Sequence, residues 1–318
     1  MDSCDELERI LNGTIKRART RNPHELFWAL FYLYQGIFVR NFSRDIFDFS
    51  STNIYDLDWD VLVLLDACRV DVLADHSNDH WFLDHPLQSV CSVGGDSNGW
   101  MERTFVSDHA AEMANTAYIT ANPHSELVLD SSEFSLLDEV WRYSWDDELG
   151  TVPPRPVTDR AIEAGREGNS SRLIVHYMQP HFPSIPNPEL GSEIIAGQVG
   201  SDWNDSIWDK LLHREISYQE AWGAYSDNLS LVLNEVALLF DNISADRAVV
   251  SADHGNAFGE YGFYGHGEYP LRCVRDVPWV VTSTTDSRTR IPEPIETEPE
   301  EVTNTDIESR LEALGYVT

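Results

Sequence analysis

Carboxylate and histidine side chains, the residue types that hold divalent metal ions, are concentrated in one glycine-rich stretch. Residues 250–270 read VSADHGNAFGEYGFYGHGEYP, with Asp253 and His254 adjacent and His266 further along. Oxygen and nitrogen ligands of this kind suit Zn²⁺ or Mn²⁺. The intervening glycines let the backbone fold back, so that His266 can return to the same pocket. The alternative is that Asp253 and His254 cap a helix and that His266 lies in an ordinary loop.

Three short apolar runs lead into candidate ligands of the same types. The runs and their ligands are Val61–Leu65 with Asp66, Leu173–Val175 with His176 and His181, and Ala248–Val250 with Asp253 and His254. Apolar runs without alternation are typical of strands that are buried on both faces of a parallel sheet. Since ligands bind outside the carboxyl ends of the strands in open α/β sheets, the three loops are expected to be neighbours in space. The sequence therefore predicts a metal site at this edge of a sheet.

The apolar pattern also predicts the elements that must position these side chains. A fourth apolar run lies at residues 277–283. The segment 218–240 carries apolar residues at helical spacing, namely Leu229, Val232, Leu233, Val236 and Phe240. Strands that alternate with helices predict an α/β fold, with a mostly parallel central sheet and helices on both faces.

We expect three parts along the chain. Residues 1–50 are predicted to form a helical segment that packs on the core, and residues 51–284 to form the α/β domain itself. Residues 285–318 are predicted to form an acidic, Pro/Glu/Thr-rich strap and a C-terminal helix of the same domain. That helix reads DIESRLEALG, with its glycine in the C-cap role.

The charge of the chain excludes some classes of partner. The sequence has 54 acidic residues against 22 basic ones, a formal net charge of −32. Such a surface repels nucleic acid and anionic lipid. Its self-repulsion is tolerated best in concentrated salt, which shortens the range of electrostatic forces. We therefore predict a halophilic source and no nucleic-acid partner, and we attribute the acidity to the solvent rather than to the substrate.

The cellular location is predicted from cysteines and apolar segments. The 4 cysteines show no CxxC spacing, as expected for reduced thiols in the cytoplasm. The N-terminus has no apolar core of a signal peptide. Residues 26–39, LFWALFYLYQGIFV, are too short to cross a hydrocarbon core of about 30 Å. We expect them to pack on a cytoplasmic domain, with peripheral membrane contact as the alternative. The oligomeric state stays open.

Four motifs together resemble the alkaline phosphatase superfamily. LVLLDACRVD looks like its first metal-binding strand, where sulfatase-like members show D-x-x-R-x-D. SADHGNAFGEYGFYGH is similar to its S-D-H-G-x-x-x-G-E-x-x-x-x-G-H signature, with one alanine inserted. HYMQPHFP resembles its Y-M-x-P-H-x-P loop, and LEALGYV resembles its usual C-terminal end. The motifs span residues 61–317 in the expected order, so the chain resembles a sulfatase-like branch of haloarchaeal type.

The resemblance implies a ligand set and a nucleophile. By position, Asp66, Asp253 and His254 would hold the principal metal ion. The family's nucleophile lies in a loop before a helix, here SVCSVGGDSNGWMERTF, where Ser97 is the first choice and Ser92 the second. A hydroxyl bound to a dication loses its proton readily and becomes an alkoxide. The alternative role for Ser97 is the N-cap of a helix that starts near Trp100, which is compatible with catalysis.

The remaining site residues also follow from the resemblance. His181 and His266 would contact the substrate oxyanion or complete a second metal site. Arg69 would approach a phosphate or sulfate, or else be structural. Members with two metals supply an additional carboxylate near His176 or Gln179, which this chain lacks, so one metal ion is expected. Zn²⁺ or Mn²⁺ is the first choice for this ion, and Mg²⁺ or Ca²⁺ the second.

The reaction implied is attack of a serine alkoxide on a phosphate or related ester. Sulfatases proper use a cysteine in C-x-P-x-R or C-x-A-x-R, which neither Cys91 nor Cys68 matches. We therefore expect a metal-dependent phosphoesterase or phosphotransferase rather than a true sulfatase. One alternative is a catalytically degenerate member that binds an anionic glycan or lipid head group, because GGDSNG is an unusual nucleophile loop. The other is a membrane-peripheral factor that acts through residues 26–39.

Overall fold

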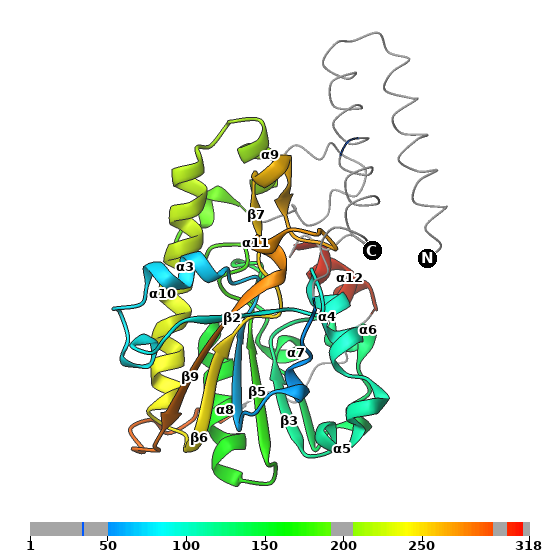
Figure 1. The fold of residues 1–318 in the computed structure, drawn as a ribbon, viewed down its shortest axis with the longest axis vertical. Coiled ribbons are helices and arrows are strands. Elements are labelled where there is room, and N and C mark those ends of the chain that lie inside the picture. Colours follow the sequence, from blue (N-terminus) through cyan, green and yellow to red (C-terminus); the bar gives the residue numbers. More distant parts are fainter. Residues whose placement is uncertain (1–33, 35–49, 192–205, 295–303, 314–318) are drawn as a thin grey trace.

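A seven-stranded sheet with helices on both faces forms the centre of the molecule (Figure 1). The structure, a computed structural model, describes residue 34 and residues 50–191, 206–294 and 304–313. The strands are β1 (Val61–Leu65), β2 (Gln88–Cys91), β3 (Thr116–Thr120), β4 (Leu136–Glu139), β5 (Arg172–Tyr177), β6 (Ala245–Ser251), β7 (Ala257–Phe258), β8 (Tyr264–Gly265) and β9 (Asp276–Thr284). The α-helices are α3 (Val70–Asp75), α4 (Ser97–Thr104), α5 (Ala110–Met113), α6 (Ser125–Val128), α7 (Trp141–Ser144), α8 (Pro154–Glu167), α9 (Ile207–Leu212), α10 (Tyr218–Phe240), α11 (Arg272–Arg275) and α12 (Asn304–Ala313).

The sheet is mostly parallel, in the order β2-β9-β6-β1-β5-β3-β4. Strand β1 pairs in parallel with β5 and β6, and β3 pairs in parallel with β4 and β5. Strand β9 runs antiparallel to β6 and β2. A separate two-stranded hairpin, β7–β8, stands above the end of the sheet. The predicted fold class is confirmed by this arrangement.

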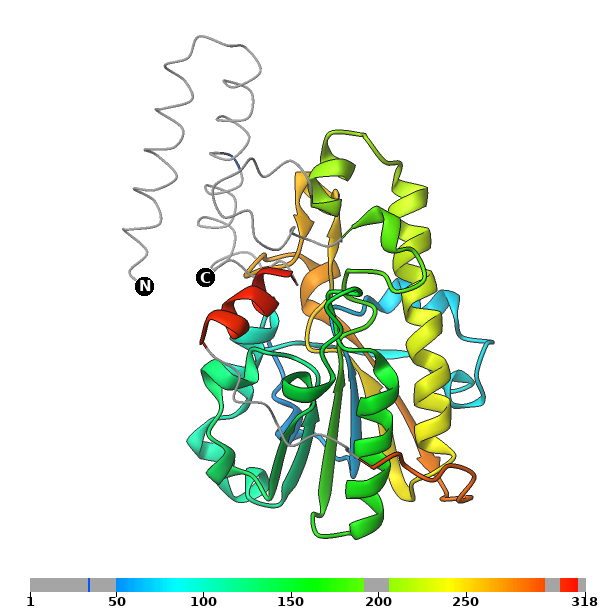
Figure 2. The same cartoon turned by 180° about the vertical axis from the view of Figure 1, so that it is seen from behind.

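Strand β1 shows why the sheet must be covered on both faces. Its five residues are all buried, and they alternate between two apolar clusters. Val61, Val63 and Leu65 pack in the cluster that contains α8 and α10, which lie across one face in Figure 2. Leu62 and Leu64 pack in the cluster that contains Trp100 and Met101 of α4. A continuous apolar run is therefore the expected sequence for this strand.

All four predicted strands are present: β1 has the predicted bounds, and β5, β6 and β9 extend one to a few residues beyond the apolar runs. Sequence reasoning missed three strands of the sheet, β2, β3 and β4. All five residues of β3, TAYIT, are buried, and threonine, tyrosine and isoleucine favour strands. This β-branched and aromatic composition was the available signal. Strand β2 lies at the sheet edge and is partly exposed, so its sequence shows a weaker apolar pattern.

The predicted helix at residues 218–240 is α10, and its five predicted apolar positions are buried. Its start is set by a capping box, in which the Ser217 hydroxyl accepts from the Glu220 amide while the Glu220 carboxylate accepts from the Ser217 amide. The long helix supplies Tyr225, whose hydroxyl accepts from the amide of Arg69 at 3.1 Å and donates to the carbonyl of Ala67. The helix thereby fixes the loop that follows β1.

The C-terminal segments pack on the same domain where the structure describes them. Ile307 and Leu311 of α12 are buried in the cluster that contains α8 and α10, and Arg310 donates to the carbonyl of Trp141 at 2.8 Å. The start of the predicted strap is tied to α8 by ion pairs of Asp286 with Arg166 and of Arg290 with Asp159. The predicted helical segment 1–50 and the aromatic stretch 26–39 lie outside the described residues, apart from residues 34 and 50. Among the described helices, none is both long and apolar enough to cross a membrane.

Candidate metal centre and nucleophile

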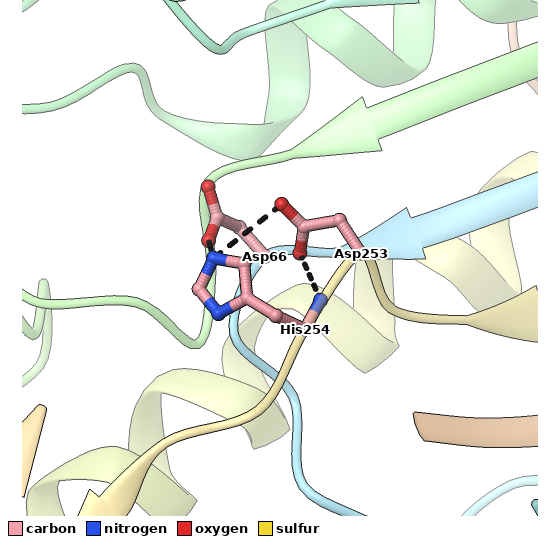
Figure 3. A group of neighbouring side chains, drawn as sticks. All are labelled: Asp66, Asp253 and His254. Atoms are coloured by element: carbon pink, nitrogen blue, oxygen red, sulfur yellow. Dashed lines mark hydrogen bonds and ion pairs between the residues drawn. The ribbon is translucent and has the colours of Figure 1, made fainter. Parts of the chain in front are cut away.

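Two carboxylates and one imidazole meet at the carboxyl edge of the sheet. Asp66 follows β1, and Asp253 and His254 follow β6, the strand beside it. Their ligand atoms all lie within 4.8 Å of one another, and all three side chains are fully buried (Figure 3). Nε2 of His254 is 3.5 Å from Oδ1 of Asp66 and 3.5 Å from Oδ2 of Asp253. The residues that the motif resemblance assigned to the principal metal ion thus form one cluster.

The protonation of His254 makes this cluster a fit for a cation. Its Nδ1 lies 3.0 Å from the carbonyl oxygen of Gly255, and a carbonyl can only accept, so the ring proton is on Nδ1. In the neutral ring, the form that binds a metal ion, the lone pair of Nε2 would face two carboxylate oxygens. Three electron-rich atoms that converge in a dry interior repel one another unless a positive charge lies between them. A carboxylate–imidazole set of this kind is the donor chemistry of Zn²⁺ and Mn²⁺ sites.

Asp253 is held by bonds to both of its oxygens. Oδ1 accepts from the amide of Ala67 at 3.2 Å and from the amide of His254 at 2.9 Å. Burial opposes ionisation, but the neighbouring histidines and the hydroxyl of Ser97 hold the pKa of Asp253 below its usual range. The side chain is therefore a carboxylate that is fixed in orientation before any ligand binds.

Ser97 reaches the centre of this cluster. Its Oγ lies 2.6 Å from Oδ2 of Asp253, 3.4 Å from Oδ2 of Asp66 and 3.4 Å from Nε2 of His254. It is fully buried and is the first residue of α4. The N-cap is Asp96, whose side chain accepts from the amide of Gly99 at 2.7 Å. The alternative in which Ser97 caps a helix starting near Trp100 is wrong, because Asp96 satisfies that end and leaves the Ser97 hydroxyl to the cluster.

Ser92, the second choice for the nucleophile, has a different place. Its hydroxyl donates to the backbone carbonyl of Asp253 and accepts from the amide of Gly94 at 3.2 Å. It therefore links the loop before α4 to the loop after β6. No bond from its hydroxyl to a side chain of the metal cluster is recorded among the described residues.

The nucleophile loop and the His266 loop meet in a close contact between their backbones. The amide of Gly267 donates to the carbonyl of Gly95 at 2.9 Å. A Cβ on Gly95 would lie 2.1 Å from the carbonyl oxygen of Gly267, so only glycine allows this approach. Outside the contact, Glu268 pairs with Arg103 of α4 at 2.7 Å. The two loops are therefore positioned as one unit.

Asn122 is a site residue that sequence reasoning missed. Its Nδ2 donates to Oδ2 of Asp66 at 2.9 Å, and the side chain is fully buried. It follows β3, two strands from β1 in the sheet order. The same strand-end rule that selected Asp66 and Asp253 would have found it, had TAYIT been assigned as a strand. His124, also buried, follows in the same loop.

His181 and His266 lie next to the cluster. The ring centroid of His266 is 4.5 Å from that of His254 and 5.0 Å from that of His181. Nδ1 of His181 lies 2.5 Å from the carbonyl oxygen of Phe182, and Nδ1 of His266 lies 3.2 Å from Oδ1 of Asn256. Both acceptors favour a proton on Nδ1. His266 is outside the group of ligand atoms within 4.8 Å, so its predicted role as a metal ligand stays a prediction.

Burial keeps these histidines neutral. It lowers the pKa of His181 to about 4, with His254 adding to the effect, and it lowers the pKa of His124 to about 3. Burial likewise holds the pKa of His266 well below its ordinary value. A neutral ring with its proton on Nδ1, as in His181 and His266, presents a lone pair on Nε2.

Arg69 follows β1 but its guanidinium is engaged elsewhere. It pairs with Asp71 and Glu260, each at 2.6 Å, and donates to the carbonyl of Asn256 at 2.8 Å. Its charge also lies 5.1 Å from the ring centroid of Trp222. These contacts support the structural alternative for Arg69, and its contact with a substrate stays a prediction.

Comparison with known proteins identified similar solved structures. The soluble domain of lipooligosaccharide phosphoethanolamine transferase A from Neisseria meningitidis is 12% identical, with a TM-score of 0.49 over 80% of this chain and 86% of that chain. The C-terminal periplasmic domain of the transferase EptC from Campylobacter jejuni is 13% identical, with a TM-score of 0.45 over 70% of this chain and 78% of that chain. These solved proteins are phosphoethanolamine transferases.

The integral membrane form of the Neisseria enzyme, EptA, is also similar, at 11% identity and a TM-score of 0.48. The match covers 98% of this chain and 66% of that chain. No protein-family profile matches the sequence, and no curated protein does. At such low identity and structural similarity, function has to be argued from the residues of this chain.

Proposed function

We propose that the protein is a metal-dependent enzyme that cleaves or transfers phosphate esters, with Ser97 as its nucleophile. The observation that carries the proposal is the position of Oγ of Ser97, within 3.4 Å of an atom of each of Asp66, Asp253 and His254. A hydroxyl is placed this way where it must be activated by the same cation that the three side chains hold. The position also argues against the non-catalytic alternative, since the GGDSNG loop delivers its serine to the cluster.

Asp66, Asp253 and His254 would hold the ion, with Asn122 fixing Asp66 from the side. A bound divalent cation supplies positive charge that favours the alkoxide form of a neighbouring serine and the charge that develops on a phosphate in the transition state. Zn²⁺ or Mn²⁺ fits the mixed oxygen and nitrogen donors best, with Mg²⁺ or Ca²⁺ as the second choice.

The proposed reaction has two displacements at phosphorus. In the first, the bond from Ser97 Oγ to phosphorus forms and the bond from phosphorus to the ester oxygen breaks. The proton lost by Ser97 ends on the leaving alcohol. In the second, water or an acceptor alcohol attacks the phosphoserine and releases Ser97. Two inversions predict net retention of configuration at phosphorus.

His181 and His266 are assigned to proton transfer and charge stabilisation in both steps. Each presents a neutral Nε2, which can take a proton from the attacking group and return it to a departing oxygen. The ring of His266 lies beside that of His254 and the ring of His181 beside that of His266, so both histidines are next to the cluster that Ser97 contacts. Once Nε2 has taken up a proton, its N–H can donate a hydrogen bond to a developing oxyanion, which adds electrostatic stabilisation in a site that excludes water.

The test is to trap the covalent intermediate. The purified protein, loaded with Mn²⁺ or Zn²⁺ in molar KCl, is incubated with phosphomonoester, phosphodiester and sulfate ester substrates and quenched in acid. Mass spectrometry should find phosphate, or a phosphate-linked group, on Ser97. Turnover in water alone indicates a hydrolase, and turnover that requires an added alcohol indicates a transferase. A metal-loaded protein that neither turns over any ester nor carries a modified Ser97 would refute the proposal.

A further inference from the structure

One more buried histidine, His176, lies against the metal cluster. His176 is the penultimate residue of β5, the strand between β1 and β3, and it is fully buried. Its Nδ1 is 2.8 Å from the hydroxyl of Tyr118, a fully buried residue of β3. Its Nε2 is 3.6 Å from Oδ2 of Asp253, longer than a hydrogen bond, and has no hydrogen-bond partner among the described residues. The three side chains therefore form a line, Tyr118–His176–Asp253, inside the protein.

The carboxylate decides where the proton of His176 lies. If Nδ1 carried the proton, the lone pair of Nε2 would face the carboxylate of Asp253, and the two would repel. With the proton on Nε2, that N–H points at the carboxylate, and Nδ1 is free to accept from the hydroxyl of Tyr118. Tyr118 is a donor that suits this arrangement, because a phenol can donate to a bare ring nitrogen. This tautomer is the opposite of that of His254, whose proton is on Nδ1.

His176 faces Oδ2 of Asp253, the same oxygen that contacts Ser97. Oδ2 of Asp253 is the atom that accepts from Ser97 at 2.6 Å and lies 3.5 Å from Nε2 of His254. The ring of His176 is held on two sides, stacked on Tyr118 at 6.2 Å and met edge-on by Trp100 at 5.8 Å. Trp100 belongs to α4, the helix that begins with Ser97. His176 is thus packed between the helix of the nucleophile and the carboxylate of the ligand.

We propose that His176, oriented by the hydroxyl of Tyr118, is a positioning residue that fixes Oδ2 of Asp253 for the cation and for Ser97. The role rests on the proposed function of the metal centre. In this role His176 acts through Asp253 and does not contact the substrate. At 3.6 Å the ring of His176 acts on the carboxylate through the attraction of an N–H dipole for a negative charge, and a shift of a few tenths of an ångström would close the contact to a hydrogen bond. Outer partners of a metal ligand set its orientation and basicity, and their removal typically lowers metal affinity about 10- to 100-fold.

Metal binding by the full chain tests the role without any substrate. Mn²⁺ is titrated by calorimetry into the metal-free wild type and four variants at one salt concentration. His176→Phe keeps the ring but loses the N–H, so we expect Mn²⁺ affinity to fall about 10- to 100-fold. His176→Gln keeps an N–H near the position of Nε2 and should restore most of the loss. Tyr118→Phe removes only the orienting hydroxyl and should give an intermediate loss.

Tyr177→Phe is the matched control. It removes a buried hydroxyl from the residue next to His176, but that hydroxyl bonds to Thr158 of α8 at 2.9 Å, in the other apolar cluster. It should lower stability without changing Mn²⁺ affinity. If His176→Phe and Tyr118→Phe both bind Mn²⁺ as the wild type does, the inference is overturned. If His176→Phe does not fold, Tyr118→Phe decides the outcome alone.

The tautomer gives an independent readout on the metal-free protein. Long-range ¹H–¹⁵N spectra of the histidine rings should show His176 with its proton on Nε2 and a bare, hydrogen-bonded Nδ1. In Tyr118→Phe the Nδ1 resonance should move toward that of a nitrogen without a hydrogen bond. A proton on Nδ1 of His176 in the wild type would overturn the inference. Neither Mn²⁺ affinity nor the tautomer depends on turnover. The role of His176 can therefore be tested even if the proposed reaction is refuted.

Discussion

Oγ of Ser97 lies 2.6 Å from Oδ2 of Asp253, although 156 positions separate the two residues in the chain. The contact joins the start of a helix on one face of the sheet to the loop at the end of a central strand. It places the hydroxyl of Ser97 where that hydroxyl and the carboxylate of Asp253 could bind the same cation. The predictions below follow from this contact and from the residues that support it.

Ser97→Ala should separate catalysis from metal binding. The variant loses the nucleophile but keeps Asp66, Asp253 and His254, so kcat should fall by at least about a thousandfold while metal affinity changes little. Initial rates and calorimetric titration with Mn²⁺ measure the two effects. Ser92→Ala is the control, because its hydroxyl bonds to backbone and should mainly cost about 1 kcal/mol of stability. If Ser92→Ala were inactive and Ser97→Ala active, the nucleophile would be Ser92.

Removing the metal should lower the stability of the wild type and leave Asp253→Asn unaffected. The two buried carboxylates repel each other without a cation, and a ligand that binds only the native state at 100 times its Kd adds about 2.7 kcal/mol. Thermal unfolding with Mn²⁺ and with a chelator measures this difference. Asp253→Asn removes one of the two charges and a ligand atom, so its Tm should not respond to Mn²⁺. An equal rise in both proteins would place the metal elsewhere.

Arg69→Gln distinguishes a structural arginine from one that binds the substrate. The guanidinium ties the loop after β1 to Asp71, Glu260 and the carbonyl of Asn256, so its loss should cost about 2–3 kcal/mol of stability. KM should change little in the fraction that remains folded. Urea unfolding and steady-state kinetics measure the two quantities. A large rise in KM at unchanged stability would instead support the contact with substrate that the motif resemblance implied.

Gly95→Ala should disable the enzyme, whereas Gly223→Ala should not. A Cβ on Gly95 would meet the backbone oxygen of Gly267 at 2.1 Å, so the nucleophile loop and the His266 loop must separate. A Cβ on Gly223, within α10, would have nothing within 4 Å. We expect a large fall in kcat for the first variant and a gain in stability of about 0.5–1 kcal/mol for the second. Equal activity of the two variants would show that the contact of the loops is dispensable.

The local sequence predicted much of the fold. Apolar runs of strand length, such as VLVLL in β1, identify a strand buried on both faces because every residue in them must be covered. The abrupt change from Leu65 to Asp66 marks the end of that strand and, by the strand-end rule, a ligand position. The edge strand β2 and the short strand β4 are only partly buried, so their sequences are too weakly apolar to be found in this way.

The roles of supporting residues depended on distant partners. Arg69 and His176 both stand at strand ends, where a ligand or a substrate contact is expected, yet each is engaged by side chains from other parts of the sequence. Asn122 shows the converse case, since its amide enters the site only because β3 lies two strands from β1. Nothing in the local sequence around these residues distinguishes a metal ligand from its support.

The sequence by itself indicated the fold class and the three side chains of the candidate metal cluster, since burial and residue type leave a pattern along the chain, while the family resemblance pointed to the loop that contains Ser97. Only the tertiary structure decided which serine reaches the carboxylates, which histidine stands behind Asp253 and what the guanidinium of Arg69 contacts. These contacts span distances of 2.6–3.6 Å between side chains that are far apart in the chain. Hydrogen bonds and ion pairs act over such short ranges that no spacing along the sequence encodes them.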